Sequence, residues 1–196
     1  METSYVQGPS RGEQVVLFAR NFFKHPKMLG SLIPSSRFLI NQVLGRVDWS
    51  STRCVVEYGP GVGSFTTEIL RRLRPDGNLI VLETNPDFVR LLKRSYDDPR
   101  LKIVHRSAAD ISRVLKEQGL GHADFIISGI PFSTMKPQLR SSILRASRDA
   151  LGSRGEMLVY QFSGEVLRDL RKTFRTVEQD FELLNVLPAR IFVCRS

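Results

Sequence analysis

Three glycines, Gly59, Gly61 and Gly63, separate a short apolar run from a helical pattern in the stretch VVEYGPGVGSFTTEIL, residues 55–70. Glycine adopts positive φ without strain and lets a ligand approach the backbone, because it has no Cβ atom. A tight turn without a ligand is the alternative, but three glycines within five residues favour a binding loop. The spacing therefore predicts that a ligand lies at this junction.

The residues around the loop narrow the choice of ligand. Ser64 stands where a dinucleotide-binding fingerprint requires its third glycine, and no Gly-Lys-Ser/Thr follows, so a P-loop is excluded. Glu83 ends the next apolar run, where a carboxylate can accept hydrogen bonds from both hydroxyls of a ribose, as NAD and S-adenosylmethionine require. Glu57 does not suit a pyrophosphate, but it suits a ligand that carries ammonium and sulfonium charges. Together these acids favour S-adenosylmethionine.

Asp110 follows a third apolar run, in the stretch HRSAADI. Its carboxylate is placed to accept a hydrogen bond from an adenine amino group. The same residue type is also a preferred N-cap for the helical pattern that follows it. Both interpretations stay open from the sequence.

The predicted ligand-binding residues can meet only if the fold brings the ends of several strands together. From residue 54 the chain alternates apolar runs with helical patterns. Such alternation predicts an α/β fold, a parallel sheet with helices on both faces and its ligand at the carboxyl ends of the strands. Only a Leu-Pro turn separates the last two runs, so they should form an antiparallel hairpin. The expected strands are 54–59, 78–83, 101–105, 123–129, 156–162, 180–186 and 189–195, and the expected helices are 64–73, 86–96, 111–119, 136–151 and 164–174.

Composition sets the outer bounds. The 196 residues suffice for one ordinary domain, and 29 Lys and Arg against 20 Asp and Glu give a net charge of +9. That charge favours an anionic partner, nucleic acid or membrane, although an inert basic surface would look the same. The apolar runs are too short to cross a bilayer, and the N-terminus does not read as a secretory signal. Cys54 and Cys194 lie in strand-like runs and are expected to be reduced, which predicts a cytoplasmic protein.

The stretches VVEYGPGVGSFT and ETNP resemble the first and second motifs of the class I S-adenosylmethionine-dependent methyltransferases, whose Rossmann-like sheet has seven strands and one antiparallel C-terminal strand. The form E-x-G-P-G-x-G-x-x-T is typical of two groups, the ribosomal RNA adenine dimethyltransferases and the bacterial phospholipid N-methyltransferases. The cofactor-binding residues that we predict are Pro34, Ser35, Ser36, Glu57, Tyr58, Gly59, Gly61, Gly63, Glu83, Thr84, Asn85, Ala109, Asp110 and Ser128.

The motif after the fourth strand separates the two groups. Adenine N6-methyltransferases carry Asn-Leu/Pro-Pro-Tyr/Phe there, in which the Asn holds the exocyclic amine and the aromatic ring stacks on the flipped base. This chain reads SGIPFS, so Ser128 and Gly129 replace the start of the motif while Pro131 and Phe132 remain. The helical C-terminal domain of the RNA enzymes is also missing before the chain stops at Ser196. We therefore favour the phospholipid group, with RNA adenine methylation and a non-catalytic cofactor-binding protein as alternatives.

Residues 1–50 are predicted to be an N-terminal amphipathic helical segment, ahead of a methyltransferase domain at 51–196. Helical spacing puts Phe18 and Phe22 on one side, with Arg20 and Lys24 on the other. Such a helix suits an anionic membrane interface, although a helix packed on the domain has the same pattern.

The stretch GSLIPSSRFL then resembles the segment that closes over the cofactor in the phospholipid enzymes. By that resemblance the lid residues would be Pro34, Ser35 and Ser36, near the methionine end of the cofactor.

Methyl transfer requires an amine lone pair aligned with the sulfonium carbon, and an amine with a pKa of about 10 must first lose a proton. Tyr160 is the first candidate to pass that proton on, with a purely structural tyrosine as the alternative. Phe132 could offer a ring face to the methylated nitrogen by cation–π attraction. The predicted catalytic residues are Tyr160, Ser128, Gly129, Ile130, Pro131 and Phe132, and the candidates for the lipid phosphate are Lys24, His25, Lys136 and Arg190.

The resulting expectation is a peripheral enzyme on the inner face of the membrane. It would methylate phosphatidylethanolamine and its mono- and dimethyl derivatives towards phosphatidylcholine, with S-adenosylmethionine as cofactor. Its expected partners are an anionic membrane surface and the phospholipid, with neither nucleic acid nor a metal ion.

Overall fold

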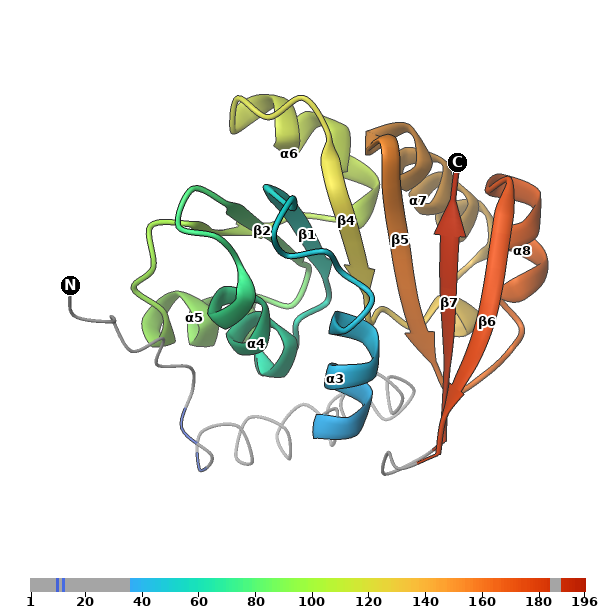
Figure 1. The fold of residues 1–196 in the computed structure, drawn as a ribbon, viewed down its shortest axis with the longest axis horizontal. Helices are drawn as coiled ribbons and strands as arrows, with labels where there is room; N and C mark the ends of the chain where they lie inside the picture. The colour runs from blue at the N-terminus through green and yellow to red at the C-terminus, as the bar shows by residue number, and fades with distance from the viewer. Residues whose placement is uncertain (1–9, 11, 13–35, 184–187) are drawn as a thin grey trace.

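Apolar side chains on both faces of the central strands dictate a sheet that is covered on both sides. The computed structural model describes residues 10, 12, 36–183 and 188–196, and its seven strands lie in the order β3-β2-β1-β4-β5-β7-β6 (Figure 1). Only β7 runs antiparallel to its neighbours. The strands are β1 Cys54–Tyr58, β2 Asn78–Glu83, β3 Leu101–His105, β4 Ala123–Ser128, β5 Leu151–Gln161, β6 Thr176–Glu182 and β7 Ala189–Arg195.

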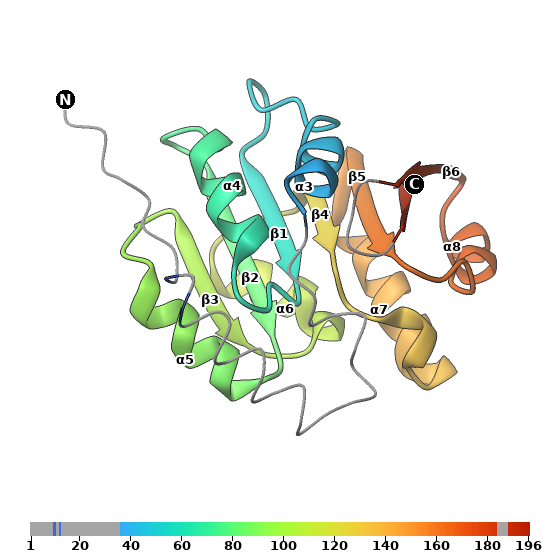
Figure 2. The same cartoon turned by 90° about the horizontal axis from the view of Figure 1, so that it is seen from below.

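The helices cover the two faces in groups of three, which follow the chain (Figures 1 and 2). On one face lie α3 Arg37–Leu44, α4 Ser64–Arg72 and α5 Pro86–Ser95, and on the other lie α6 Ile111–Glu117, α7 Pro137–Ala150 and α8 Leu167–Thr173. Two 3₁₀ turns, η2 Ala108–Asp110 and η3 Phe132–Thr134, follow β3 and β4. The predicted α/β class, the seven-stranded sheet and the closing antiparallel hairpin are confirmed.

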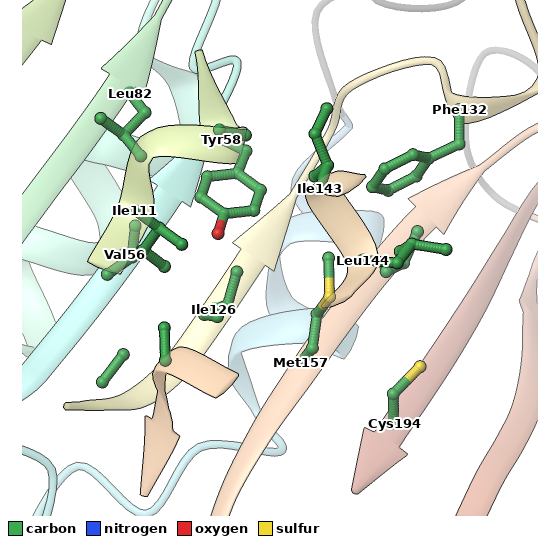
Figure 3. Packing of buried hydrophobic residues seen from close by; sticks show 14 of the residues in the cluster. Val56, Tyr58, Leu82, Ile111, Ile126, Phe132, Ile143, Leu144, Met157 and Cys194 are labelled. Carbon is green, nitrogen blue, oxygen red and sulfur yellow. The ribbon is translucent and has the colours of Figure 1, made fainter. Parts of the chain in front are cut away.

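Alternation along β1 divides the core into its two halves. Val55 packs under α3, α4 and α5, whereas Val56 and Tyr58 pack under α6, α7 and α8. Figure 3 shows the second half, where Tyr58 and Phe132 lie among aliphatic side chains of the sheet and of α7. Glu57 alternates with these residues and so projects towards the α4 side, where it is the one charged side chain of β1.

Three elements, β5, β6 and α8, differ from the sequence prediction by three residues or more at one or both ends. β5 begins at Leu151 instead of residue 156, with a register irregularity opposite Ala123 and Phe125, because its first residues are small or polar. β6 begins at Thr176 and ends at Glu182, since an edge strand can be largely polar. α8 begins at Leu167, three residues later than expected.

The segment ahead of β1 is partly integrated into the domain. α3 buries Leu39, Val43 and Leu44 against the sheet, so residues 37–44 belong to the packed core, although the sequence assigned them to the N-terminal segment. The predicted helix with Phe18, Arg20, Phe22, Lys24 and His25 and the predicted lid residues Pro34 and Ser35 lie outside the described residues.

Two further sequence predictions concern redox state and membrane spans. Cys54 and Cys194 are free and buried, as expected, and burial raises the pKa of each thiol to about 12. Within the described ranges, every helix is too short or too polar to cross a bilayer.

Candidate active site

The conformation and packing of the protein itself, as well as any ligand, explain why glycines occupy the loop after β1. Gly59, Gly61 and Gly63 adopt φ values of 64°, 56° and 85°, which side-chain-bearing residues rarely take. A Cβ atom on Gly59 would lie 2.6 Å from Ile130 Cγ2, and one on Gly63 would lie 2.5 Å from the Tyr96 hydroxyl. The sequence predicted glycine for close ligand approach. The structure adds that two of the three positions are already filled by side chains of the protein.

Tyr96 fastens the loop to α4. Its hydroxyl donates to the Gly63 carbonyl at 2.9 Å and lies 2.7 Å from Thr67 Oγ1. The same carbonyl accepts from the Thr67 backbone N–H at 3.0 Å. Contacts within the protein therefore fix the conformation of the loop at Gly63. Sequence reasoning missed Tyr96, because a tyrosine just past α5 carries no local signal of contact with a loop 33 residues earlier.

Glu57 is buried behind the loop with one oxygen satisfied. Thr66 Oγ1 donates to Glu57 Oε2 at 2.7 Å, which explains why the motif places a threonine nine residues after the glutamate. Glu57 Oε1 has no hydrogen-bond partner within the described chain. Burial raises the pKa of Glu57 to about 8, against the opposing hydrogen bond from Thr66 and with the help of the negative charge of Glu83. A cationic ligand at Oε1 would satisfy this oxygen and favour the ionised carboxylate.

Glu83 joins the end of β2 to the glycine loop. Its Oε1 accepts from the backbone N–H groups of Thr84 and Asn85, both at 2.7 Å, and its carboxylate also accepts from the N–H of Gly61. Burial raises the pKa of Glu83, although these hydrogen bonds oppose the rise. The predicted ribose acceptor is thus buried at the loop, where it also orders the backbone.

The remaining predicted cofactor residues are placed by local turns. Asp110 occupies the N-cap position of α6, but its side chain makes no capping hydrogen bond, so the capping interpretation lacks the contact that it needs. Asn85 caps α5 by accepting from the Asp87 N–H at 2.9 Å, and Ser36 caps α3. The Tyr58 side chain does not face the loop: it is fully buried, 3.1 Å from Ser147 Oγ, on the opposite side of the sheet.

The loop after β4 meets the end of β5. The Gly129 N–H donates to the Tyr58 carbonyl at 3.1 Å, which continues the β1–β4 pairing. A Cβ atom on Gly129 would lie 2.2 Å from the Tyr160 hydroxyl. The Tyr160 ring stacks on Phe65 of α4, with centroids 4.6 Å apart and planes inclined by 16°. The phenol therefore occupies the space that a side chain at position 129 would take.

Two polar side chains that the sequence analysis did not select hold this loop. Gln161 Nε2 donates to the Ile130 carbonyl at 2.8 Å, and Arg140 donates to the Phe132 carbonyl at 3.1 Å. Arg140 is itself paired with Asp169 of α8 at 2.7 Å. The loop backbone is thus fixed from two directions, by β5 and by α7.

Phe132 corrects one prediction. Its side chain is fully buried with Ile143 and Leu144 of α7, as Figure 3 shows, so it presents no ring face to a substrate nitrogen. The 3₁₀ turn η3 directs the Phe132 ring into the core, where it packs against apolar side chains of α7.

The candidate phosphate ligands lie at the same edge of the sheet. Lys136 is exposed at the N-cap position of α7, and Arg190 opposes Gln161 in the β5–β7 register. The Arg190 guanidinium lies 4.7 Å from the centre of the Phe181 ring, a cation–π contact.

The polar atoms at this edge fit a cationic adenosyl cofactor. Glu57 Oε1 is buried without a hydrogen-bond partner in the described structure, on the α4 face of β1, whereas the equally unpartnered Ser128 Oγ is in register with Tyr58 and lies on the other face of the sheet. Buried polar groups without partners are rare in folded proteins, and a bound ligand is one cause. The described residues hold no cluster of three or more His, Cys, Asp or Glu side chains suited to a metal ion.

Comparison with known proteins agrees with this site. A family model described as ribosomal RNA adenine dimethylase matches residues 22–152. An ornithine lipid N-methyltransferase of Singulisphaera acidiphila is 33% identical over 182 residues, which are 92% of this chain and 95% of the relative. The chain belongs to the ribosomal RNA adenine dimethylase family. It is an S-adenosylmethionine-dependent class I methyltransferase, and the predicted family, fold and cofactor are confirmed.

Other members and neighbours extend the comparison. A ribosomal RNA small subunit methyltransferase A of Mycoplasma mycoides is 29% identical over 113 residues, which are 56% of this chain and 40% of that family member. Human methyltransferase-like protein 13 in complex with SAH shares the fold, with a TM-score of 0.61, 16% identity and coverage of 81% of this chain and 79% of that chain. The relatives of this chain therefore include proteins named for lipid and for RNA, and the acceptor side of the site must distinguish the two kinds of acceptor.

Proposed function

We propose that this methyltransferase transfers methyl groups to the primary amine of a membrane lipid, with phosphatidylethanolamine and its mono- and dimethyl derivatives as substrates. The observation that carries the proposal is the 33% identity to a protein named as an ornithine lipid N-methyltransferase, over nearly the full length of both chains. Ornithine and ethanolamine both end in a primary amine, so the two lipids pose the same chemical problem at the reacting nitrogen.

The acceptor side supports a lipid amine over adenine. Alignment of the adenine N6 motif on Pro131 and Phe132 puts its Asn at position 129, where this chain has Gly129. The Tyr160 hydroxyl fills the space of that missing side chain. The amide that would hold the exocyclic amine is absent, and the Phe132 ring that would stack on a flipped base is buried. A flexible alkyl amine needs neither contact.

The same geometry supports our proposal that Tyr160 takes part in proton transfer. Bound S-adenosylmethionine supplies an electrophilic methyl group on a sulfonium centre. An alkyl amine is protonated at neutral pH, so its proton must leave before the lone pair can attack. The Tyr160 hydroxyl lies beside Gly129, on the acceptor side of the site, and can accept a hydrogen bond from the amine and pass its proton towards solvent. Stacking on Phe65 keeps the ring in this position.

Gln161 and Arg140 act as positioning residues in this scheme. By holding the carbonyls of Ile130 and Phe132, they fix the backbone against which the amine must align. Alignment of the reacting atoms contributes a large part of the rate in a displacement that needs little covalent catalysis. The buried Ser128 hydroxyl, in register with Tyr58, projects to the other face of the sheet and is given no role in this scheme.

An anionic membrane surface is the proposed partner. The net charge of +9 supports this partner, and we propose that Lys136 and Arg190, which lie at the carboxyl edge, meet a lipid phosphate. Phe18, Arg20, Phe22 and Lys24 of the N-terminal segment remain proposed membrane contacts.

One experiment compares the candidate acceptors directly. Purified protein with radiolabelled S-adenosylmethionine is offered phosphatidylethanolamine vesicles, ornithine lipid vesicles or unmodified small-subunit ribosomal RNA. Label in phosphatidylethanolamine supports the proposal. Label only in the ornithine lipid keeps lipid N-methylation but corrects the headgroup, which lacks a phosphate. Label only in the RNA refutes the lipid assignment, and the family relationship makes that arm necessary.

A further inference from the structure

The exposed apolar side chains of the described chain are concentrated at one edge of the molecule. Among the described residues, the large hydrophobic side chains that are exposed are Phe38, Leu139, Phe181 and Leu183, with exposures of 57%, 44%, 48% and 72%. Phe38 is in the first turn of α3, Leu139 is in the first turn of α7, and the other two are at the end of β6.

These positions share the carboxyl edge of the sheet. α7 begins directly after the β4 loop, and β6 runs parallel to β5, so the start of α7 and the end of β6 lie where the parallel strands end. Gln42 of α3 and Arg46, two residues after the end of α3, contact Asp180 of β6, and Gln42 also donates to the Phe181 carbonyl. Phe38 lies one helical turn before Gln42, towards the end of β6. Figure 2 looks onto this edge from below Figure 1.

The charges of this edge suit an anionic surface. Arg37 and Lys136 are exposed beside Phe38 and Leu139, and Arg190 lies over Phe181. Two acids flank Phe181: Asp180, which is paired with Arg46, and Glu182. Asp169 at the start of α8 is paired with Arg140. Glu165 is an exposed acid on this side. Isolated exposed hydrophobic side chains are ordinary, but their collection at one edge, among cations, is what an interfacial surface requires.

We infer that this carboxyl edge is a membrane-docking surface, in which Phe38, Leu139, Phe181 and Leu183 enter the lipid interface and Arg37, Lys136 and Arg190 meet anionic headgroups. The inference rests on the proposed function, and it concerns a surface distinct from the N-terminal segment. Docking by this edge would bring the lipid amine to Gly129 and Tyr160 without lifting the acyl chains out of the bilayer, because the acceptor loop opens at the same edge.

The test uses two variants of the full chain, with substitutions away from the acceptor site. Phe38→Gln with Leu183→Gln removes apolar surface from two exposed positions, so the fold should not change. Arg37→Glu reverses one charge of the edge. Its matched control is Lys116→Glu, an exposed charge at the end of α6, at the opposite edge of the sheet.

Co-sedimentation with vesicles of equal parts phosphatidylethanolamine and phosphatidylglycerol measures docking. Methylation of a dispersed short-chain phosphatidylethanolamine measures the acceptor site alone. We expect the double variant to bind vesicles about tenfold more weakly, since two apolar side chains no longer leave water, with unchanged activity on the short-chain lipid. Arg37→Glu should bind more weakly at low salt, whereas Lys116→Glu should bind like the unaltered protein.

The outcomes separate this inference from the proposed function. Unchanged vesicle binding in both edge variants overturns the docking surface, even if lipid methylation is observed. If the unaltered protein is a dimer that the double variant dissociates while vesicle binding persists, the edge is a contact between copies and the inference is wrong. If no lipid is methylated but the double variant loses vesicle binding, the docking surface stands while the proposed function fails.

Discussion

The cofactor side and the acceptor side of the carboxyl edge are stabilised by different kinds of contact. On the cofactor side, formed by β1, β2 and the glycine loop, the two buried carboxylates accept hydrogen bonds from the protein: Glu57 from the Thr66 hydroxyl, and Glu83 from backbone N–H groups. On the acceptor side, formed by β4, β5 and the β6–β7 hairpin, an aromatic hydroxyl fills an empty side-chain position and apolar residues face outwards. The contrast indicates that cofactor recognition is built into the stability of the fold, while substrate choice depends on few, separable side chains.

The largest effect is expected on the cofactor side, from Gly63→Ala. Positive φ and the approach to the Tyr96 hydroxyl should together lower the free energy of unfolding by about 2–4 kcal/mol. Urea denaturation measures the loss. Gly119→Ala, with positive φ but open space, should lose only about 1–2 kcal/mol, and Gly121→Ala, also in open space, almost nothing. Equal losses at all three positions would mean that contact with Tyr96 is unimportant.

Tyr160→Phe should affect only the acceptor side. Loss of the hydroxyl should lower kcat about 100-fold, because the bound amine loses the group that accepts its proton before the attack. The ring and its stack on Phe65 remain, so stability and cofactor affinity should be unchanged. Single-turnover methylation and calorimetry provide the two readouts. A normal kcat in this variant would show that the Tyr160 hydroxyl has no role in proton transfer.

Glu83→Ala should weaken cofactor binding by about 1.5–3 kcal/mol, because charged hydrogen bonds to the ribose are lost. The structure adds a control. Glu83→Gln keeps an oxygen for the N–H groups of Thr84, Asn85 and Gly61, so it should preserve the loop better than alanine. If alanine binds cofactor with unchanged affinity in calorimetry, Glu83 serves the loop backbone alone.

Glu57 should make stability depend on pH. Burial raises its pKa in the folded protein to about 8, above the value near 4.5 of an unperturbed glutamate. Between these values the folded chain keeps a proton that the unfolded chain has lost, so stability should fall by about 1.4 kcal/mol per pH unit as pH rises. Glu57→Gln should remove this slope in urea titrations of the cofactor-free protein at several pH values. An identical slope in the variant would assign the titration to another group.

The smallest effect is expected from Tyr96→Phe. Its hydroxyl donates one hydrogen bond to the Gly63 carbonyl, which still accepts from Thr67, so about 1 kcal/mol of unfolding free energy should be lost. Thermal denaturation measures the change, and cofactor affinity should fall only a few-fold. A loss as large as that of Gly63→Ala would show that the hydroxyl, rather than backbone conformation, holds the loop.

Most of the fold follows from local patterns. Apolar runs such as NLIVLE, buried on both faces, and the glycines at one strand end led to the correct sheet and cofactor. The polar starts of β5 and β6 could not be found in this way, since pairing with neighbouring strands stabilises them instead of apolar alternation.

The contacts that shape the site were less accessible to sequence reasoning. Glu57 and Thr66 lie within one recognisable motif, but Tyr96 reaches Gly63 and Gln161 reaches Ile130 only after the chain has folded. Phe132 shows the opposite error, because a motif position shared with enzymes that stack a base does not fix which way the ring turns.

The close approach of Gly129 and Tyr160 also constrains evolutionary change. An asparagine at position 129 cannot enter while the phenol occupies its place, unless the ring leaves its stack on Phe65. The two positions should therefore covary among descendants of a common ancestor. A lineage that changes from an alkyl amine to adenine as acceptor would have to lose or displace the Tyr160 ring before it gains asparagine at position 129. The fold therefore constrains the order of the two mutations.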